Sequence, residues 1–143
     1  MKYLKPYTIY LPHLILIAAL TGTLGSLYFS EILHFVPCDL CWWQRIFMYP
    51  LVPLVAVGIV LHDKKLPFYI LSIAGIGWLI SIYHNLLYYN IIPHPIVPCR
   101  SGVSCTDPVV QMFGFIDIPL GSFLTFTFIL VCTIIYIKFN KQK

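Results

Sequence analysis

The chain is 143 residues long, which is enough for one domain. Hydrophobic residues make up 59% of it and charged residues only 10%, and its mean hydropathy is +0.86. A soluble domain carries about a quarter charged residues, so this composition excludes an ordinary soluble protein and indicates an integral membrane protein. The net charge of +4 comes from cations spread over short tails and one turn, which gives no reason to expect a nucleic-acid partner.

Four apolar stretches are long enough to cross a membrane, for which a helix needs about 20 residues. They lie at about residues 7–29, 40–61, 66–91 and 118–137. The second contains Pro50 and Pro53, which membrane helices tolerate because neighbouring helices satisfy the freed carbonyls. The first is longer than the apolar core of a cleaved signal peptide, so we expect an uncleaved helix. The prediction for residues 1–143 is a single all-α membrane domain, a four-helix transmembrane bundle.

The distribution of lysine and arginine predicts how the bundle is oriented. With four spans, both termini and the turn after the second span share one side of the membrane. Seven of the nine cations fall on that side, and only Arg45 and Arg100 fall on the other. Because such cations mark the cytoplasmic side, we expect cytoplasmic termini in a cell-membrane protein. The loops at about residues 30–39 and 92–117 are then extracytoplasmic, and the apolar stretch from Val109 to Ile116 is expected to be a short helix or turn on the membrane surface.

Cys38 and Cys41 form a C-x-x-C motif where the first outer loop enters the second span. The spacing lets the two sulfurs meet at the start of a helix, where unpaired N–H groups stabilise a thiolate. By this argument Cys41 is better placed than Cys38 to have a lowered pKa. The motif favours redox chemistry on the oxidising side of the membrane, and it leaves a structural disulfide or half of a zinc site open.

Arg45 lies one helical turn after Cys41 and is the only charge within the four predicted spans. A cation at the membrane boundary is costly unless it reaches the interface or has a partner. The expected partners are the Cys41 thiolate and an anionic or carbonyl-bearing ligand, and the alternative is a lipid phosphate. Trp42 and Trp43 are first interpreted as interface aromatics, which could also wall an aromatic ligand site.

A second pair, Cys99 and Cys105, encloses five residues of the long outer loop. A disulfide over such a short, exposed loop tends to be reducible, although a simple loop staple is the alternative. A four-cysteine zinc site is the main chemical rival, but the wider spacing of this pair fits zinc poorly. We therefore assign no metal ligands.

Two further residues are single candidates without a motif. His84 lies toward the outer half of the third span, where a polar residue is a functional candidate or a packed, hydrogen-bonded histidine. The fifth cysteine, Cys132, lies in an apolar run and is expected to be a small buried side chain.

The segment from Cys38 to Arg45, Cys-Asp-Leu-Cys-Trp-Trp-Gln-Arg, resembles the C-x-L-C-x-x-x-R signature of the DsbB family of disulfide bond formation proteins. The resemblance extends over the whole chain, through four spans, two cysteine pairs and the entry Gly114–Pro119 to the last span. The small size and short second pair are most similar to the BdbC branch of Gram-positive bacteria.

The resemblance implies a quinone-dependent thiol oxidase with Cys38, Cys41, Cys99 and Cys105 as catalytic residues. An extracytoplasmic thioredoxin-fold partner would reduce Cys99–Cys105, with Cys99 meeting the partner. Cys105 would then exchange with Cys38, and Cys41 would face a membrane quinone, expected to be menaquinone. Arg45 and His84 are the residues implied to bind the quinone. Gln44 stands where some family members carry an acid.

Overall fold

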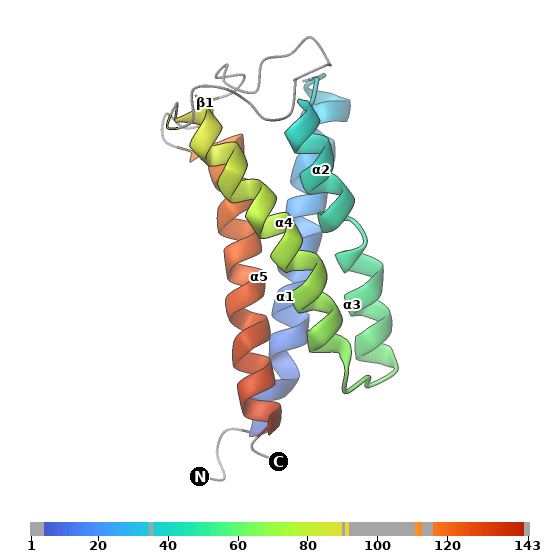
Figure 1. Ribbon diagram of the computed structural model, residues 1–143. Helices are drawn as coiled ribbons and strands as arrows, with labels where there is room; N and C mark the ends of the chain where they lie inside the picture. The colour runs from blue at the N-terminus through green and yellow to red at the C-terminus, as the bar shows by residue number, and fades with distance from the viewer. Residues whose placement is uncertain (1–4, 35, 90, 92–110, 113–115, 142–143) are drawn as a thin grey trace.

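The computed structural model describes residues 5–34, 36–89, 91, 111–112 and 116–141. Within these residues, four helical segments are long and apolar enough to span a membrane. They are Tyr10–Ile32, Asp39–Val60, Leu66–Tyr88 and Ile118–Phe139. The segments pack side by side into one elongated bundle, with both chain termini at the same end (Figure 1). The predicted all-α, four-helix transmembrane fold is therefore confirmed.

The first span consists of α1 (Lys5–Leu27) followed directly by a π-helical segment, η1 (Tyr28–Ile32). The wider turn of η1 ends when the Leu33 N–H donates to the Tyr28 carbonyl over 3.2 Å. His34 then adopts a positive φ of 55°, which reverses the chain toward the second span. This reversal places the end of the first span beside the start of α2.

The second span is broken into two helices, α2 (Asp39–Met48) and α3 (Leu51–Val60). Pro50 and Pro53 have no backbone N–H, so each leaves a carbonyl of the preceding turn without its helical donor. The Tyr49 carbonyl instead accepts from the Val52 N–H over 3.2 Å, a tighter bond than the α-helical one. The second span is present as predicted, but its helix is interrupted at Tyr49 and Pro50.

The third and fourth spans are α4 (Leu66–Tyr88) and α5 (Ile118–Lys141), which pack closely against each other. Gly77 of α4 leaves room for the fully buried ring of Phe126, because a Cβ there would lie 2.5 Å from two ring carbons. Trp78 adds a polar contact by donating its Nε1–H to Thr127 Oγ1 over 2.9 Å. Asn85, one turn before the end of α4, donates to the Pro119 carbonyl over 3.0 Å. These contacts hold the C-terminal half of α4 against the N-terminal half of α5.

Two short strands precede α5. Residues of β1 (Gln111–Met112) and β2 (Ile116–Asp117) pair antiparallel, with Gln111 opposite Asp117. A short helix was one expectation for the stretch from Val109 to Ile116, and for its three described residues, Gln111, Met112 and Ile116, it is wrong.

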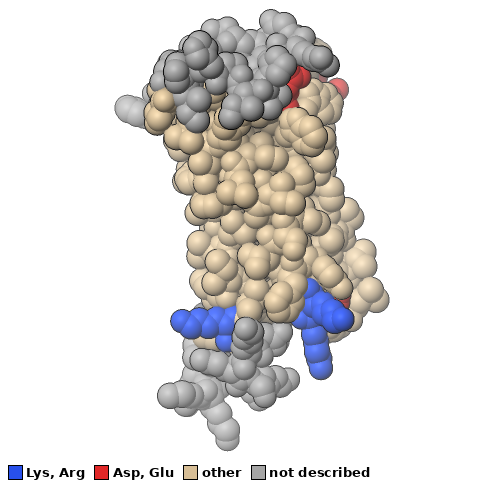
Figure 2. Space-filling model, viewed as in Figure 1, with Lys and Arg blue, Asp and Glu red and all other residues tan. Residues whose placement is uncertain are grey.

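Charged side chains separate along the long axis of the bundle. The face in Figure 2 shows blue lysine side chains at the end that holds the termini and red carboxylates mainly at the other. Lys65 directly precedes α4 at the first of these ends, and Lys138 lies near the end of α5. Glu31, in η1, and Asp39, at the start of α2, lie at the opposite end with the C-x-x-C motif.

Candidate redox site

Cys38 and Cys41 lie at the first turn of α2. Cys38 is the N-cap residue, with an extended backbone at φ −69° and ψ 166°, and its Sγ accepts from the Cys41 N–H over 3.3 Å. Both cysteines are free thiols, and their Sγ atoms lie 2.7 Å apart in a hydrogen bond. Since a disulfide bond is about 2.05 Å long, the pair can close into a disulfide with only a small approach of the two sulfurs.

The Cys38 sulfur is held in an environment that favours its thiolate. The hydrogen bond with the Cys41 thiol is the largest cause that lowers the pKa of Cys38, from 9.0 to about 4. His84 and the Cys41 N–H also lower this pKa, while desolvation of the buried sulfur opposes them. The expectation that Cys41 is the better-placed thiol is wrong. Cys38 is the capping residue, so its sulfur accepts the free N–H at the helix start.

His84 of α4 reaches across to the cysteine pair. Its Nε2 lies 3.8 Å from Cys38 Sγ, and its side chain is only 2% exposed. On the other side of the ring, Gln44 Nε2 lies 3.1 Å from His84 Nδ1, and Gln44 is only 5% exposed. Both ring nitrogens of His84 are thereby fixed by residues of α2. Leu40 and Leu87 pack in the same small apolar cluster as Cys38, which shields the group from water.

Gln44 is a member of this group that the sequence argument did not select. Two signals were available: its position three residues after Cys41, on a neighbouring part of the same helix face, and its place within the family signature, where some members carry an acid. Its partner His84 is 40 residues away along the chain, so the contact could not be deduced from spacing.

Arg45 connects the second span to the first. Its Nη2 donates to the Ser26 carbonyl over 3.0 Å, and its guanidinium lies 5.3 Å from the centre of the Trp42 ring. The expected partners were the Cys41 thiolate and a ligand. The hydrogen-bond acceptor in the structure is a backbone carbonyl of α1, while the charge of Arg45 also acts on the Cys41 sulfur, as expected. Trp42 is half-exposed and stacks against the cation, which is a cation–π contact.

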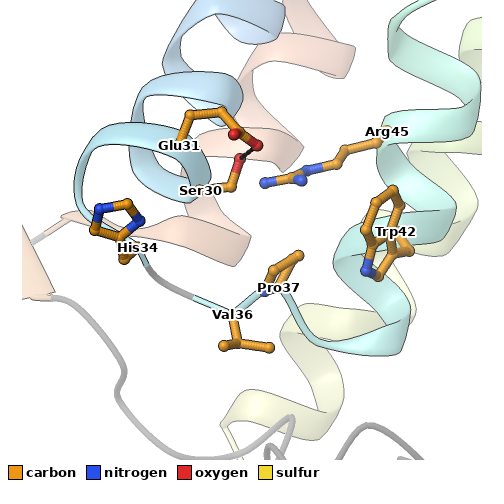
Figure 3. Close-up of a pocket in the computed structure, with 7 residues that line it drawn as sticks. All are labelled: Ser30, Glu31, His34, Val36, Pro37, Trp42 and Arg45. Atoms are coloured by element: carbon orange, nitrogen blue, oxygen red, sulfur yellow. Dashed lines mark hydrogen bonds between the residues drawn. The ribbon is translucent and has the colours of Figure 1, made fainter.

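An open cavity of about 250 Å³ lies beside Arg45, between η1 and the start of α2 (Figure 3). Figure 3 shows the guanidinium directed toward Ser30 and Glu31 across the cavity, with the Trp42 ring alongside. The lining residues are Ser30, Glu31, His34, Val36, Pro37, Trp42 and Arg45. His84 is not among them, so the two residues expected to bind a quinone do not share this cavity.

The remaining predicted cysteines have different outcomes. Cys99 and Cys105 lie outside the described residues, so their expected roles remain predictions. Cys132 is buried in the main apolar core of the bundle, as expected, together with residues such as Phe126 and Ile129. It belongs to a different cluster from Cys38.

A four-span membrane bundle with a paired dithiol at the entry to its second span is typical of membrane thiol–disulfide oxidoreductases. The family model described as "Disulfide bond formation protein DsbB" matches residues 10–136 of this chain. The chain therefore belongs to the DsbB family, as the signature around Cys38 and Arg45 had indicated.

Relatives named as disulfide formation proteins align with most of the chain. It is 44% identical to the "Probable disulfide formation protein C 1" of Bacillus anthracis, over 87% of this chain and 88% of that protein. It is also 44% identical to the "Disulfide bond formation protein C" of Bacillus subtilis, over 80% of this chain and 83% of that protein. No solved structure matches the chain significantly. The family and these relatives show that this is a membrane disulfide oxidoreductase that supports disulfide bond formation.

Proposed function

We propose that the chain reoxidises an extracytoplasmic thioredoxin-fold thiol oxidase and passes the electrons to a membrane quinone. The observation that carries the proposal is the Cys38–Cys41 pair, with touching sulfurs, a favoured Cys38 thiolate and His84 in contact. A dithiol of this kind exchanges readily because the thiolate is the attacking species. A structural staple gains nothing from a favoured thiolate.

Two thiol–disulfide exchanges link the partner to this pair. The reduced partner gives two electrons and two protons to the Cys99–Cys105 disulfide, with Cys99 meeting the partner, and leaves as a disulfide. The resulting dithiol reduces Cys38–Cys41 in the same way, through attack of Cys105 on Cys38. Closing the Cys38–Cys41 disulfide again removes two electrons and the accompanying protons from the pair, and these pass to the membrane quinone. The Cys38 thiolate is suited to form the new S–S bond to the Cys41 sulfur as those electrons leave.

The cavity beside Arg45 fits a quinone ring. A bound quinone would supply a two-electron, two-proton acceptor with two carbonyl oxygens on a flat ring. Trp42 offers a flat apolar wall, and Arg45 uses one of its five N–H donors on Ser26, leaving others for a carbonyl oxygen or its anion. We propose Arg45 as a quinone-binding residue and menaquinone as the quinone. His84 faces Cys38, where it supports the thiolate, and its predicted contact with the quinone remains a prediction.

The proposed location is the cell membrane, with both termini in the cytoplasm and the cysteine pairs outside. The lysine-rich end of the bundle holds the termini, which agrees with the positive-inside rule. The C-x-x-C motif lies at the other end, where an exported partner can reach it.

A turnover assay in detergent tests this proposal. Purified protein is mixed with a reduced thioredoxin-fold oxidant and a short-chain menaquinone analogue, and quinone reduction is followed by absorbance. We expect steady reduction that is abolished in Cys41→Ala, and a loss of roughly 10²-fold in Arg45→Ala, typical of removing a positioned charge stabiliser. Cys132→Ser is the matched control and retains full activity. Intact disulfides without any quinone reduction across several partners and quinones would overturn the proposal in favour of a structural role.

A further inference from the structure

Three metal-ligating atoms converge at the start of α2. The Sγ atoms of Cys38 and Cys41 and a ring nitrogen of His84 all lie within 4.8 Å of one another. In the part of the chain that the structure describes, no other group of three or more histidine, cysteine or acidic side chains has this arrangement. It differs from the four-cysteine site that the sequence left open, because its third ligand is His84 of α4.

We propose that the reduced Cys38–Cys41 pair and His84 together form a Zn²⁺ site. Two cysteine sulfurs, one imidazole and an open fourth position are a known donor set for zinc. Binding requires both sulfurs as thiolates, so any thiol proton still on the pair is displaced by the cation and released to water. Two thiolates and Zn²⁺ sum to zero charge, which suits a site where Cys38 is 6% and His84 2% exposed.

The distances are close to those that such a site requires. With Zn–S bonds of about 2.3 Å and Zn–N bonds of about 2.0 Å, tetrahedral ligand atoms lie roughly 3.5–4 Å apart. Cys38 Sγ and His84 Nε2 are already 3.8 Å apart, whereas the two sulfurs are 2.7 Å apart. The sulfurs must therefore separate by roughly 1 Å, which a change of one cysteine side-chain torsion can provide.

Gln44 supplies the outer contact that zinc-binding histidines usually have. A ligating histidine donates its second ring N–H to an acceptor, which fixes the tautomer. Gln44 lies 3.1 Å from His84 Nδ1, and turning its amide over presents Oε1 to that N–H. His84 Nε2 is then free of a proton and faces the sulfurs.

The site would exist in only one redox state. The closed Cys38–Cys41 disulfide has no thiolates to offer, so zinc binds the reduced form alone. Bound zinc withdraws both sulfurs from thiol exchange and from alkylation. Zinc is therefore proposed as a reversible inhibitor that holds the enzyme in its reduced state.

The test uses the full chain in detergent without oxygen, in a background that keeps only the Cys38–Cys41 pair. The background carries Cys99→Ser, Cys105→Ser and Cys132→Ser. Zn²⁺ is titrated against a chromophoric chelator, and X-ray absorption at the zinc edge reports the ligands. We expect one zinc per reduced chain, two sulfur ligands and at least one imidazole, no binding after oxidation, and protection of both thiols from alkylation.

Variants of His84 and Gln44 distinguish a zinc site that includes the histidine from chelation by the two cysteine sulfurs alone, and His13→Ala is the control. His84→Ala is expected to weaken zinc binding at least tenfold and Gln44→Ala by about 10–100-fold. His13→Ala, at an exposed position on α1, leaves it unchanged. If His84→Ala does not fold, the absorption spectrum of the unsubstituted site still decides whether an imidazole is bound.

Three results would overturn the zinc proposal: no zinc on a reduced chain with two titratable thiols, a spectrum without imidazole, or equal binding by the oxidised chain. Each is distinguishable from failure of the oxidase proposal, because none depends on quinone or partner. A chain that reduces quinone normally but binds no zinc contradicts only the zinc proposal.

Discussion

The Cys38 sulfur is surrounded by contacts from two different helices, which favour its thiolate form. Its sulfur caps α2 through the Cys41 N–H, and it also contacts His84 on α4, 46 residues away in sequence. The C-x-x-C spacing predicted that the two sulfurs meet at a helix start, but it did not predict that Cys38 is the residue that caps the helix. The contact with His84 depends on how α2 and α4 pack, which no local pattern contains. The partner of Arg45, a carbonyl of α1, was missed for the same reason.

The lowered pKa of Cys38 gives a testable pH profile. The thiolate is the reactive form and exists above the pKa, which is about 4 for Cys38 and about 8.5 for an ordinary cysteine. In the reduced protein, alkylation of Cys38 by iodoacetamide should therefore change little from pH 8 to about pH 5 and decline only below that. Mass spectrometry of the modified peptide measures the rate at each pH.

Cys41→Ala is the informative companion variant, because it removes the largest cause of the lowered pKa of Cys38. Its alkylation profile should shift toward that of an ordinary thiol. The lowered pKa of Cys38 also determines how the stability of the reduced protein changes with pH. A pKa that is lower in the folded chain stabilises the reduced fold above the ordinary thiol pKa, and this contribution is lost as the pH falls to about 4. An unchanged profile in Cys41→Ala would contradict this assignment.

At the scale of elements, apolar run length predicted all four spans, because a membrane helix must be continuously apolar over about 20 residues. The break between α2 and α3 was less predictable. Pro50 and Pro53 were visible in the sequence, but whether a membrane helix bends or stops at proline depends on neighbouring carbonyl acceptors and donors. The strands β1 and β2 are two residues each, too short for any periodic signal.

The contact between α4 and α5 depends on one glycine. A Cβ at Gly77 would lie 2.5 Å from the Phe126 ring, whereas at Gly75, also on α4, it would meet nothing within 4 Å. Gly77→Ala should overpack this contact and lower the free energy of unfolding by about 1–3 kcal/mol. Gly75→Ala is the matched control and should be neutral or stabilising, since alanine favours a helix by about 1 kcal/mol over glycine. Thermal unfolding in detergent compares the two, and equal midpoints would contradict this packing.

At the scale of the whole molecule, the separation of charge along the bundle predicts its orientation in the membrane. In a background without the native cysteines, His34→Cys should be labelled by a membrane-impermeant maleimide applied to intact cells. Lys64→Cys, in the turn after α3, should be labelled only after the membrane is opened. The reverse pattern would place the C-x-x-C motif on the cytoplasmic side and exclude an exported partner.

The most direct test of the central claim is a single turnover without any partner protein. Chains carrying Cys99→Ser and Cys105→Ser are fully reduced, freed of reductant and mixed with a short-chain quinone, and hydroquinone and protein disulfide are both counted. We expect one hydroquinone and one Cys38–Cys41 disulfide per chain, because the α2 dithiol alone delivers the electrons. Thiols that remain reduced in the presence of excess quinone would contradict it.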